Sequence, residues 1–573
     1  MNEVCFVQKL SYVLIVCASL AHLSSANATV TIYVKQNATG ANTGVDWDNA
    51  FTNLDTALSS ITVPNEVDYE VWVAAGTYTP ANLATGFVLK HDLAIYGGFV
   101  GTELSRSQRN WETNLTVLSG DVGNDDTATC MSDTQCTPGT YGYCLDERCI
   151  GVNNSAHVVY VDESAEDDYS ATLDGFTITR GNAQQEIIPG TFDEDGGGGV
   201  VFVGGSATFR NCVIKENRAS DGGGGMYSFS TMKARLSNVT IMDNVANHGG
   251  GIGAKNIGIV EITNSRIINN RAAGDGFEGY GGGAELEGVS GSVVTMVNTL
   301  IAKNVASGSF GGGGLYMLNS GLTVNLKNCT VVDNRADHLN ASGGGLFSPS
   351  SSLVNIDNSI IWGNEASTGK QIWTSQGPSR VTVQYSNVRR IASEGNIFGS
   401  VDFTGPNVFG DNVNPLDPEN HDPHFADAGN GDYTLTSIPI SVGKNVCIDA
   451  GSHELIPADV LDVDGNGDTS EPVPLDLLRN ARQLEDRSTI DTGTTVSGCR
   501  VADMGAHEFT RPLCSKAHIV SSVPADWTID ARQPHPLYDS SLPARQGIRS
   551  AAEPIVITLD VSGSSSLQCW ELC

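Results

Sequence analysis

The chain has 573 residues, with 32 basic against 65 acidic side chains and a formal net charge of −33 at pH 7. This excess of negative charge repels nucleic acids and anionic membranes, so it excludes both as partners. It repels polyuronates as well, unless calcium lies between the two sets of negative charge.

The first 28 residues have the pattern of a secretory signal. Lys9 precedes the apolar stretch Leu10–Leu20, and Ala26–Ala28 offers a small-x-small cleavage site. The apolar stretch is too short to span a membrane, and the later apolar run Ile555–Val561 is shorter still. We therefore expect a secreted or cell-surface protein without a transmembrane segment in its mature chain.

Residues 29–120 are expected to close one end of the fold. Apolar residues at helical spacing predict an amphipathic helix that lies across the first coil. Such a cap is needed because an open sheet edge promotes aggregation. The helix is predicted from Trp47, Ala50, Phe51, Leu54, Ala57, Leu58 and Ile61, with a buried strand and turn following at Val71–Tyr78.

A polar loop at residues 130–149 holds Cys130, Cys136, Cys144 and Cys149. In an oxidising compartment, four cysteines so close together predict two local disulfides, with three possible connectivities. Cys212 and Cys329 both stand at the second position of a repeat, four coils apart, or roughly 19 Å at the usual strand spacing. That distance is too long for a disulfide, so we expect buried free thiols.

Six copies of the pattern Asn-x-x-(Ile/Val)-x-x-Asn-x-Ala lie between Asn211 and Ala366. Their period of 26 to 34 residues, with no helical spacing, indicates stacked coils. Alternating apolar residues within each copy predict a short strand with one buried face. Glycine runs after the first five copies are interpreted as corners.

The seventh position of every copy is Asn. Side chains that stack at about 4.8 Å can form amide hydrogen bonds from coil to coil. We therefore predict a structural ladder made of Asn217, Asn244, Asn270, Asn304, Asn334 and Asn364.

The fifth position of the repeat forms an outward row that is mostly apolar, and includes Met242, Ile268, Val332 and Trp362. Such a row on a solenoid can be a docking surface for a glycan or protein partner. The alternative is that a long loop within residues 390–440 covers it.

The strongest ligand-like pattern is Asp462-x-Asp464-x-Asn466-Gly467-Asp468, with Glu471 three residues later. Oxygen ligands at alternate positions and a glycine in the sixth place match the first half of a calcium loop. Val473 stands where such a loop needs a bidentate Glu. We predict a structural Ca²⁺ here and no other cofactor, the alternative being a solvated turn whose acids pair with Arg479 or Arg482.

We identify no catalytic set. Asp243 and Asp333 share the sixth position of the repeat but lie three coils apart, or about 14 Å. His248 precedes a glycine run as in some oxyanion loops, but the chain has no Gly-x-Ser-x-Gly motif, so we interpret it as a corner residue.

The N-terminal motifs Ile32–Val34, Val71–Pro80 and Ile95–Phe99 resemble the start of secreted right-handed parallel β-helix proteins of the pectin-lyase-like superfamily. The Gly-run and Asn-x-Ala repeats are similar to those of polymorphic outer membrane proteins. The resemblance implies a right-handed solenoid, but its families share no single activity.

Near the other end, Cys447–Gly451, Arg479–Arg482 and Asp503–Phe509 resemble the choice-of-anchor Q domain that closes many secreted β-helices. The tail after Arg511 departs from that pattern, and is either a minimal β module or a truncated sandwich. The predicted divisions are 1–28 signal, 29–120 cap and first coils, 121–400 repeats with the Cys-rich loop, 401–510 closing domain and 511–573 short β tail.

The sequence thus predicts an all-β fold: a right-handed parallel β-helix with an N-terminal capping helix and a small C-terminal β region. Our leading hypothesis for function is a non-catalytic binding or structural protein, adhesive or in contact with a polysaccharide or cell-surface protein. The alternative is a polysaccharide lyase or glycoside hydrolase. A compact group of acids with Arg or Lys on adjacent coils would favour the enzyme.

Overall fold

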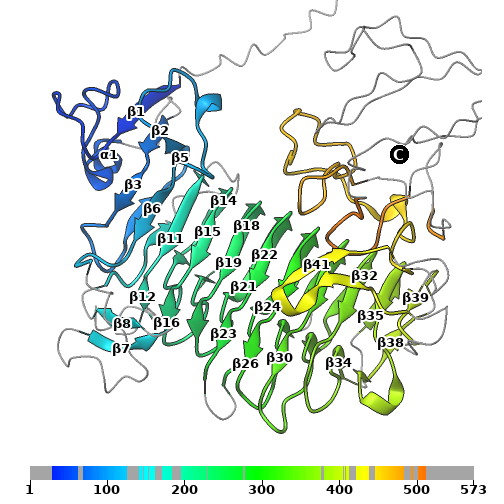
Figure 1. The fold of residues 1–573 in the computed structure, drawn as a ribbon. Coiled ribbons are helices and arrows are strands. Elements are labelled where there is room, and N and C mark those ends of the chain that lie inside the picture. Colours follow the sequence, from blue (N-terminus) through cyan, green and yellow to red (C-terminus); the bar gives the residue numbers. More distant parts are fainter. Residues whose placement is uncertain are drawn as a thin grey trace, which may run out of the picture.

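The computed structural model describes residues 29–61, 69–124, 141–145, 148–151, 154–161, 171–183, 195–228, 230, 232–274, 278–319, 321–375, 380–403, 405–406, 408–411, 421–437, 445–482, 492–494 and 501–510. Within these residues the chain winds into one stack of parallel coils (Figure 1). The predicted signal, Cys130, Cys136 and the tail from residue 511 lie outside the described residues.

A complete coil contributes four short strands, one to each of four parallel columns. In one coil these are β17 (Met226–Ser228), β18 (Met232–Ser237), β19 (Thr240–Met242) and β20 (Val245–Ala246). Each strand pairs in parallel with its counterpart in the neighbouring coils. The predicted all-β right-handed parallel β-helix is therefore confirmed.

The first two columns merge into one 20-stranded sheet because two long strands, β21 and β24, run through both. Its strands are β1 (Val30–Val34), β2 (Tyr69–Ala74), β4 (Phe87–Leu89), β5 (Leu93–Phe99), β9 (Val159–Val161), β10 (Thr172–Asp174), β13 (Val200–Phe202), β14 (Ser206–Arg210), β17, β18, β21 (Ile252–Thr263), β24 (Ala284–Val297), β27 (Leu315–Leu318), β28 (Thr323–Lys327), β31 (Leu346–Ser348), β32 (Leu353–Asp357), β34 (Ile372–Thr374), β35 (Arg380–Gln384), β37 (Ile397–Phe398) and β38 (Val401–Asp402).

The other two columns are separate sheets. The 11-stranded sheet comprises β3 (Gly76–Tyr78), β6 (Thr116–Ser119), β11 (Phe176–Thr179), β15 (Val213–Lys215), β19, β22 (Arg266–Ile268), β25 (Leu300–Ala302), β29 (Thr330–Val332), β33 (Ile360–Trp362), β36 (Ser386–Val388) and β39 (Val408–Phe409). The 6-stranded sheet comprises β12 (Asn182–Ala183), β16 (Arg218–Ala219), β20, β23 (Arg271–Ala272), β26 (Val305–Ala306) and β30 (Arg335–Ala336).

The fourth position of the repeat fills the interior. Parallel register stacks each branched residue on the next, from Ile214 through Ile241 and onward to Ile361. All six of these side chains are buried. Burying such a side chain contributes roughly 1.5–3 kcal/mol, so this column is a main source of stability.

The asparagines of the seventh position are also fully buried, and their amides form a continuous ladder. Each Nδ2 donates to the Oδ1 of the next asparagine at 2.9–3.1 Å. It also donates to the carbonyl of the repeat's branched residue in the preceding coil, as Asn304 does to Ile267 at 2.8 Å. The ladder begins at the backbone N–H of Gly181 and ends on Gln371. Every buried amide in it is therefore satisfied, which is what makes the buried polar column tolerable.

Besides the glycine runs, two positions of each repeat have a left-handed backbone at the corners. The first asparagine of every copy has a φ between 47° and 55°, and the sixth position is left-handed as well. Asp243 and Asp333, at that sixth position, have φ values of 55° and 52°. Asn and Asp tolerate this conformation because their short polar side chains bond locally. Both aspartates are therefore corner residues.

The N-terminal helix is shorter than predicted. Helix α1 spans Leu54–Ser60, and Asn53 caps it by accepting from the N–H of Thr56 at 3.0 Å. Phe51 exchanges backbone hydrogen bonds with β1, so the chain before Asn53 is not helical. Trp47 instead packs against Trp72 and Phe99. No helix in the described part of the chain is long and apolar enough to cross a membrane.

The cysteines divide into two groups. Cys212, Cys329 and Cys447 are buried free thiols, as expected for the first two, and burial raises the pKa of Cys212 to about 12. In the antiparallel pair of β7 (Tyr141–Leu145) and β8 (Arg148–Gly151), the backbone register places Cys144 opposite Cys149. The disulfides of this loop remain a prediction.

The described residues between 421 and 510, here called the closing segment, lie along the outside of the repeat coils (yellow and orange in Figure 1), with contacts from Arg210 to Asn387. Its described residues form a two-stranded antiparallel sheet and two short 3₁₀ helices. These elements are β40 (Phe425–Asp427), β41 (Asp432–Leu435), η4 (Ala428–Asn430) and η5 (His453–Leu455). Elsewhere in the described residues, short helices are η1 (Arg106–Gln108) and η3 (Ala392–Glu394).

A buried ion pair organises the closing segment. The Arg482 Nε lies 3.2 Å from the Glu508 Oε1, and both side chains are fully buried. The Arg482 Nη2 also donates to the carbonyls of Asp503 and Gly505 at 3.0 and 2.6 Å. Asp503 in turn accepts from the N–H of Asp449 at 2.7 Å. Arg482 therefore holds the core of the segment and does not pair with the acids of the 462–471 loop.

Candidate functional site: a groove along the corner asparagines

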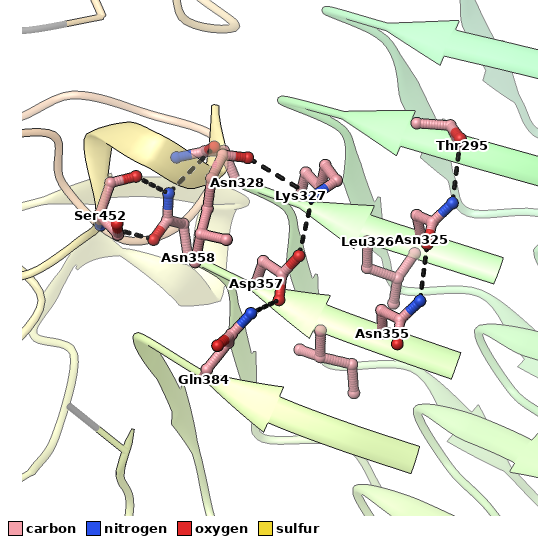
Figure 2. Close-up of polar contacts among 12 residues, drawn as sticks. Thr295, Asn325, Leu326, Lys327, Asn328, Asn355, Asp357, Asn358, Gln384 and Ser452 are labelled. Atoms are coloured by element: carbon pink, nitrogen blue, oxygen red, sulfur yellow. Dashed lines mark hydrogen bonds and ion pairs between the residues drawn. The ribbon is translucent and has the colours of Figure 1, made fainter. Parts of the chain in front are cut away.

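The first asparagines of the six copies form what we call the corner row: Asn211, Asn238, Asn264, Asn298, Asn328 and Asn358. The closing segment covers the later part of this row. Asn298 donates to the Leu475 carbonyl at 2.7 Å. Asn358 donates to the Ser452 carbonyl at 2.8 Å and accepts from the Ser452 N–H at 2.7 Å (Figure 2). Corner-row amides thus bind a polar chain laid across them.

The earlier part of the row faces a hollow instead, although Asn264 is only 6% exposed. Asn211, Asn238 and Asn264 line a hollow of about 170 Å³, and the facing wall is the 462–465 loop with Arg479. A second hollow, of about 270 Å³, adjoins it. Both hollows share Trp111, Asn211 and Asn238, so together they form one groove across the outside of the coils.

Trp111 is a half-buried aromatic wall of the groove, held by tight local packing. Gly98, with a φ of 90°, leaves room for it, since a Cβ there would lie 2.7 Å from the Trp111 backbone. The Arg109 guanidinium lies 5.1 Å from the centroid of the indole and pairs with Asp174 at 2.7 Å. An indole fixed in this way can stack on the apolar face of a sugar ring without losing much conformational entropy.

The hydrogen bonds of the corner row are interrupted inside the groove. Asn238 donates to Asn211 at 2.8 Å, and Asn298 donates to Asn264 at 2.8 Å. Neither the Asn238 Oδ1 nor the Asn264 Nδ2 has a hydrogen-bond partner among the described residues. The groove therefore offers one acceptor and one donor on neighbouring coils, about 4.8 Å apart at the usual strand spacing.

The 462–471 loop brings together a different set of acids from the one predicted. Carboxylate oxygens of Asp459, Asp464 and Glu471 lie within 4.8 Å of one another. Asp468 instead accepts from Ser470, and Asp462 accepts from the N–H of Gly467 at 3.1 Å. Asp459 was missed because it lies before the alternating pattern. Burial, together with the charges of Asp464, Asp462 and Glu471, raises its pKa to about 6.

Asn466 lies between two of these acids. Its Nδ2 donates to the Asp464 Oδ2 at 3.0 Å and to the Glu471 Oε1 at 2.5 Å. Its Oδ1 accepts from the N–H of Asp468 at 2.6 Å. Of the five residues that the sequence predicted as calcium ligands, Asp464, Asn466 and Glu471 are therefore in contact, whereas Asp462 and Asp468 turn to local backbone and hydroxyl donors.

The apolar row at the fifth position is not an open docking face. Val332 is 1% exposed and Trp362 is 8% exposed, because both pack against Tyr433, Leu435 and other residues of the closing segment. Ile268 also contacts this cluster, while Met242 is half-buried. Our docking interpretation was wrong for Val332 and Trp362. Tyr433 and Leu435 fall within the predicted covering loop, but most of the cover comes from Val446, Cys447, Ile448, Ala450, Leu477, Met504, Ala506 and Phe509.

A cluster of charged residues that the sequence did not reveal surrounds His248. Its Nε2 contacts the Asp221 Oδ1 at 2.9 Å and its Nδ1 contacts Glu285. Asp221 also accepts from Tyr227 at 2.9 Å and from Lys255 at 3.3 Å. The one available signal was position, since Asp221 and His248 each stand directly before a glycine run.

This cluster has the acids and the lysine on adjacent coils that we expected of an enzyme. Its geometry is nevertheless that of a structural ion-pair network. Both ring nitrogens of His248 contact carboxylates, and the Glu285 side chain is only 2% exposed. Asp221 is 32% exposed, but both ring nitrogens of His248 are already bonded to carboxylates and neither faces a substrate, so we interpret the cluster as a link across three coils.

We expect this link to make stability depend on pH. Although burial opposes it, the hydrogen bonds that the His248 ring donates to Asp221 and Glu285 raise its pKa to about 9, above the usual 6.5. The stabilisation is then complete below about pH 6.5 and is lost as pH rises through about 9, with a full value of about 3 kcal/mol. Thermal unfolding should be measured at pH 6, 8 and 10. The melting temperature of the wild type should exceed that of His248→Gln, and this difference should shrink as the pH rises. A margin that stays constant would contradict this assignment.

A comparison with known protein families agrees with the architecture. Residues 174–388 match a family model described as a right-handed β-helix region. Among solved structures, the crystal structure of pectate lyase Pel9A is similar at 13% sequence identity and a TM-score of 0.38, covering 85% of this chain and 97% of that chain. No curated protein matched this sequence. None of these comparisons assigns a substrate or an activity to the chain.

Proposed function

We propose that the protein is an extracellular, non-catalytic binding protein whose groove holds a neutral glycan. This proposal rests mainly on the corner row. Where the closing segment covers the row, its amides bind a polar chain, and in the groove the Asn238 Oδ1 acceptor and the Asn264 Nδ2 donor are left for a ligand. Trp111 supplies the aromatic wall beside them. Hydroxyl pairs and an apolar ring face are the two features that a sugar presents to such a surface. The extracellular location rests on the predicted signal.

The charge of the groove favours a neutral ligand. Asp174 and the 462–465 loop contribute carboxylates to its lining, on a chain whose net charge is −33. Asp174 is already paired with Arg109 and accepts from Asn211. An acidic polysaccharide would meet repulsion here, whereas a neutral one can use the amides without that cost.

A polysaccharide lyase is the second candidate, and one observation favours it. Arg210 and Arg479 line the same hollow as the acidic loop. A lyase needs a basic side chain near a uronate whose charge is neutralised. Arg210, however, is engaged with the Leu461 carbonyl at 3.0 Å, which favours binding without turnover.

The decisive experiment offers a panel of neutral and acidic polysaccharides to the purified protein. We expect retention on a neutral polymer, with neither unsaturated uronic products nor new reducing ends. The variant Trp111→Ala should weaken binding by more than about tenfold, as is typical when a central aromatic contact is removed. Turnover of any polymer would replace this proposal with the enzymatic one.

Trp373 provides the matched control. It is also half-buried, but its ring is stacked between Phe347 at 4.5 Å and Phe398 at 5.3 Å, within an aromatic row that includes Tyr280 and Tyr316. Because its faces are covered, Trp373→Ala should leave glycan affinity unchanged. Equal loss of binding in both variants would place the ligand outside the groove.

A further inference from the structure

The loop from residue 457 to residue 473 is closed at its base and attached to the coils. The Asp459 N–H donates to the Glu471 carbonyl at 2.7 Å, and the Val473 N–H donates to Pro457 at 2.9 Å. Ile456 and Val473 pack with Val297 on the outside of the stack. The base of the loop is therefore fixed, while Asp464 and Asn466 at its tip are exposed.

Asp459 is the unusual residue of this loop. It is fully buried, and only its Oδ2 is bonded, to the N–H of Val463 at 2.9 Å. Its Oδ1 is buried and has no hydrogen-bond partner among the described residues. An ionised carboxylate left in this state costs several kcal/mol, unless a cation or donor satisfies it. The nearest groups that share its site are the carboxylates of Asp464 and Glu471, which add negative charge.

We propose that Asp459, Asp464 and Glu471 together bind one calcium ion at the base of this loop. Three carboxylates within 4.8 Å of one another form the hard oxygen site that Ca²⁺ prefers. Ca²⁺ takes six to eight oxygen ligands in flexible geometry, which suits an exposed loop better than the strict octahedron of Mg²⁺ does. A rotation of the Asn466 amide would exchange the nitrogen between Asp464 and Glu471 for a fourth oxygen.

This assignment differs from the calcium loop predicted by the sequence, because its central ligand is Asp459 and it omits Asp462 and Asp468. It stands on the loop geometry alone, although Asp464 also belongs to the wall of the groove. The bound ion would hold the tip of the loop against its buried base.

The test is a calorimetric titration of the full chain with CaCl₂ after treatment with a chelator. We expect one site per chain, with an affinity in the range of extracellular modules, about 10⁻⁴–10⁻³ M. Asp459→Asn should weaken binding by more than about tenfold, and so should Asp464→Asn and Glu471→Gln. The matched control Asp468→Asn removes an equal charge from the same loop and should change the affinity by less than about twofold.

Asp464 is exposed and Glu471 is partly exposed, so their variants keep the test valid if Asp459→Asn fails to fold. Absence of binding by the wild-type chain would overturn the proposal. So would full affinity in Asp459→Asn with a native circular dichroism spectrum. If Asp468→Asn and Asp459→Asn lose equal calcium affinity, the ligand set predicted from the sequence is correct and the one proposed here is wrong.

Discussion

Replacing Arg482 with methionine is expected to release the closing segment from the coils, at a cost of about 3–5 kcal/mol. Glu508 would then be buried without its cationic partner. Burial and the nearby Asp503 carboxylate raise the pKa of Glu508 well above its usual value, and the charge of Arg482 opposes this rise. The carbonyls of Asp503 and Gly505 would lose their donor as well.

Hydrogen exchange is the appropriate measurement because solenoids unfold in parts. Protection should fall in residues 445–482 and stay unchanged in the coils around Asn244. Arg335→Met is the control, since this arginine is exposed and pairs with Asp337 at the surface, where such pairs contribute under about 1 kcal/mol.

A double variant tests the cause of that loss. Arg482→Met combined with Glu508→Leu replaces both charges by apolar groups of similar size. It should therefore be less damaging than Arg482→Met alone. If the double variant loosens the segment further, the damage comes from lost packing and the unpaired Glu508 is not its cause.

Removing one amide from the middle of the buried ladder is expected to destabilise the stack by about 3 kcal/mol. Asn304→Ala removes the side-chain donor to the Ile267 carbonyl, and it leaves the Asn334 Oδ1 with only the backbone N–H of residue 304. It also removes the acceptor that the side chain and backbone of Asn270 share. Each buried polar group that loses its partner costs about 1–3 kcal/mol, which sets this magnitude.

The outer face of the same coils offers the control. Asn325 also stacks from coil to coil, donating to Thr295 at 3.3 Å and accepting from Asn355 at 2.8 Å (Figure 2). It is half-buried, so water can replace these bonds, and Asn325→Ala should cost less than about 1 kcal/mol. Urea unfolding of the two variants compares them directly. Equal costs would show that burial does not set the value of a ladder amide.

Much of the coil stack could be predicted from its sequence because the repeat is local and periodic. The branched residue at the fourth position and Asn at the seventh position recur in phase, so stacking any two copies aligns both. Ile241 and Asn244 are buried for this reason, and their partners are the same positions one coil away. The extent of α1 could not be predicted in this way, since backbone pairing of Phe51 with β1 outweighs its helical spacing.

The candidate sites depend on contacts between distant segments, and periodicity does not encode those. The closing segment buries Val332 and Trp362 but leaves a hollow beside Asn238 and Asn264, and the repeat pattern cannot show which positions that segment covers. Asp459 became a candidate ligand only because folding buries its carboxyl beside Asp464 and Glu471. The sequence by itself determined the stacked coils, since each repeat pairs with the same positions of the neighbouring repeat. Only the tertiary structure decided which corners stay exposed, because that depends on where one non-repeating segment packs.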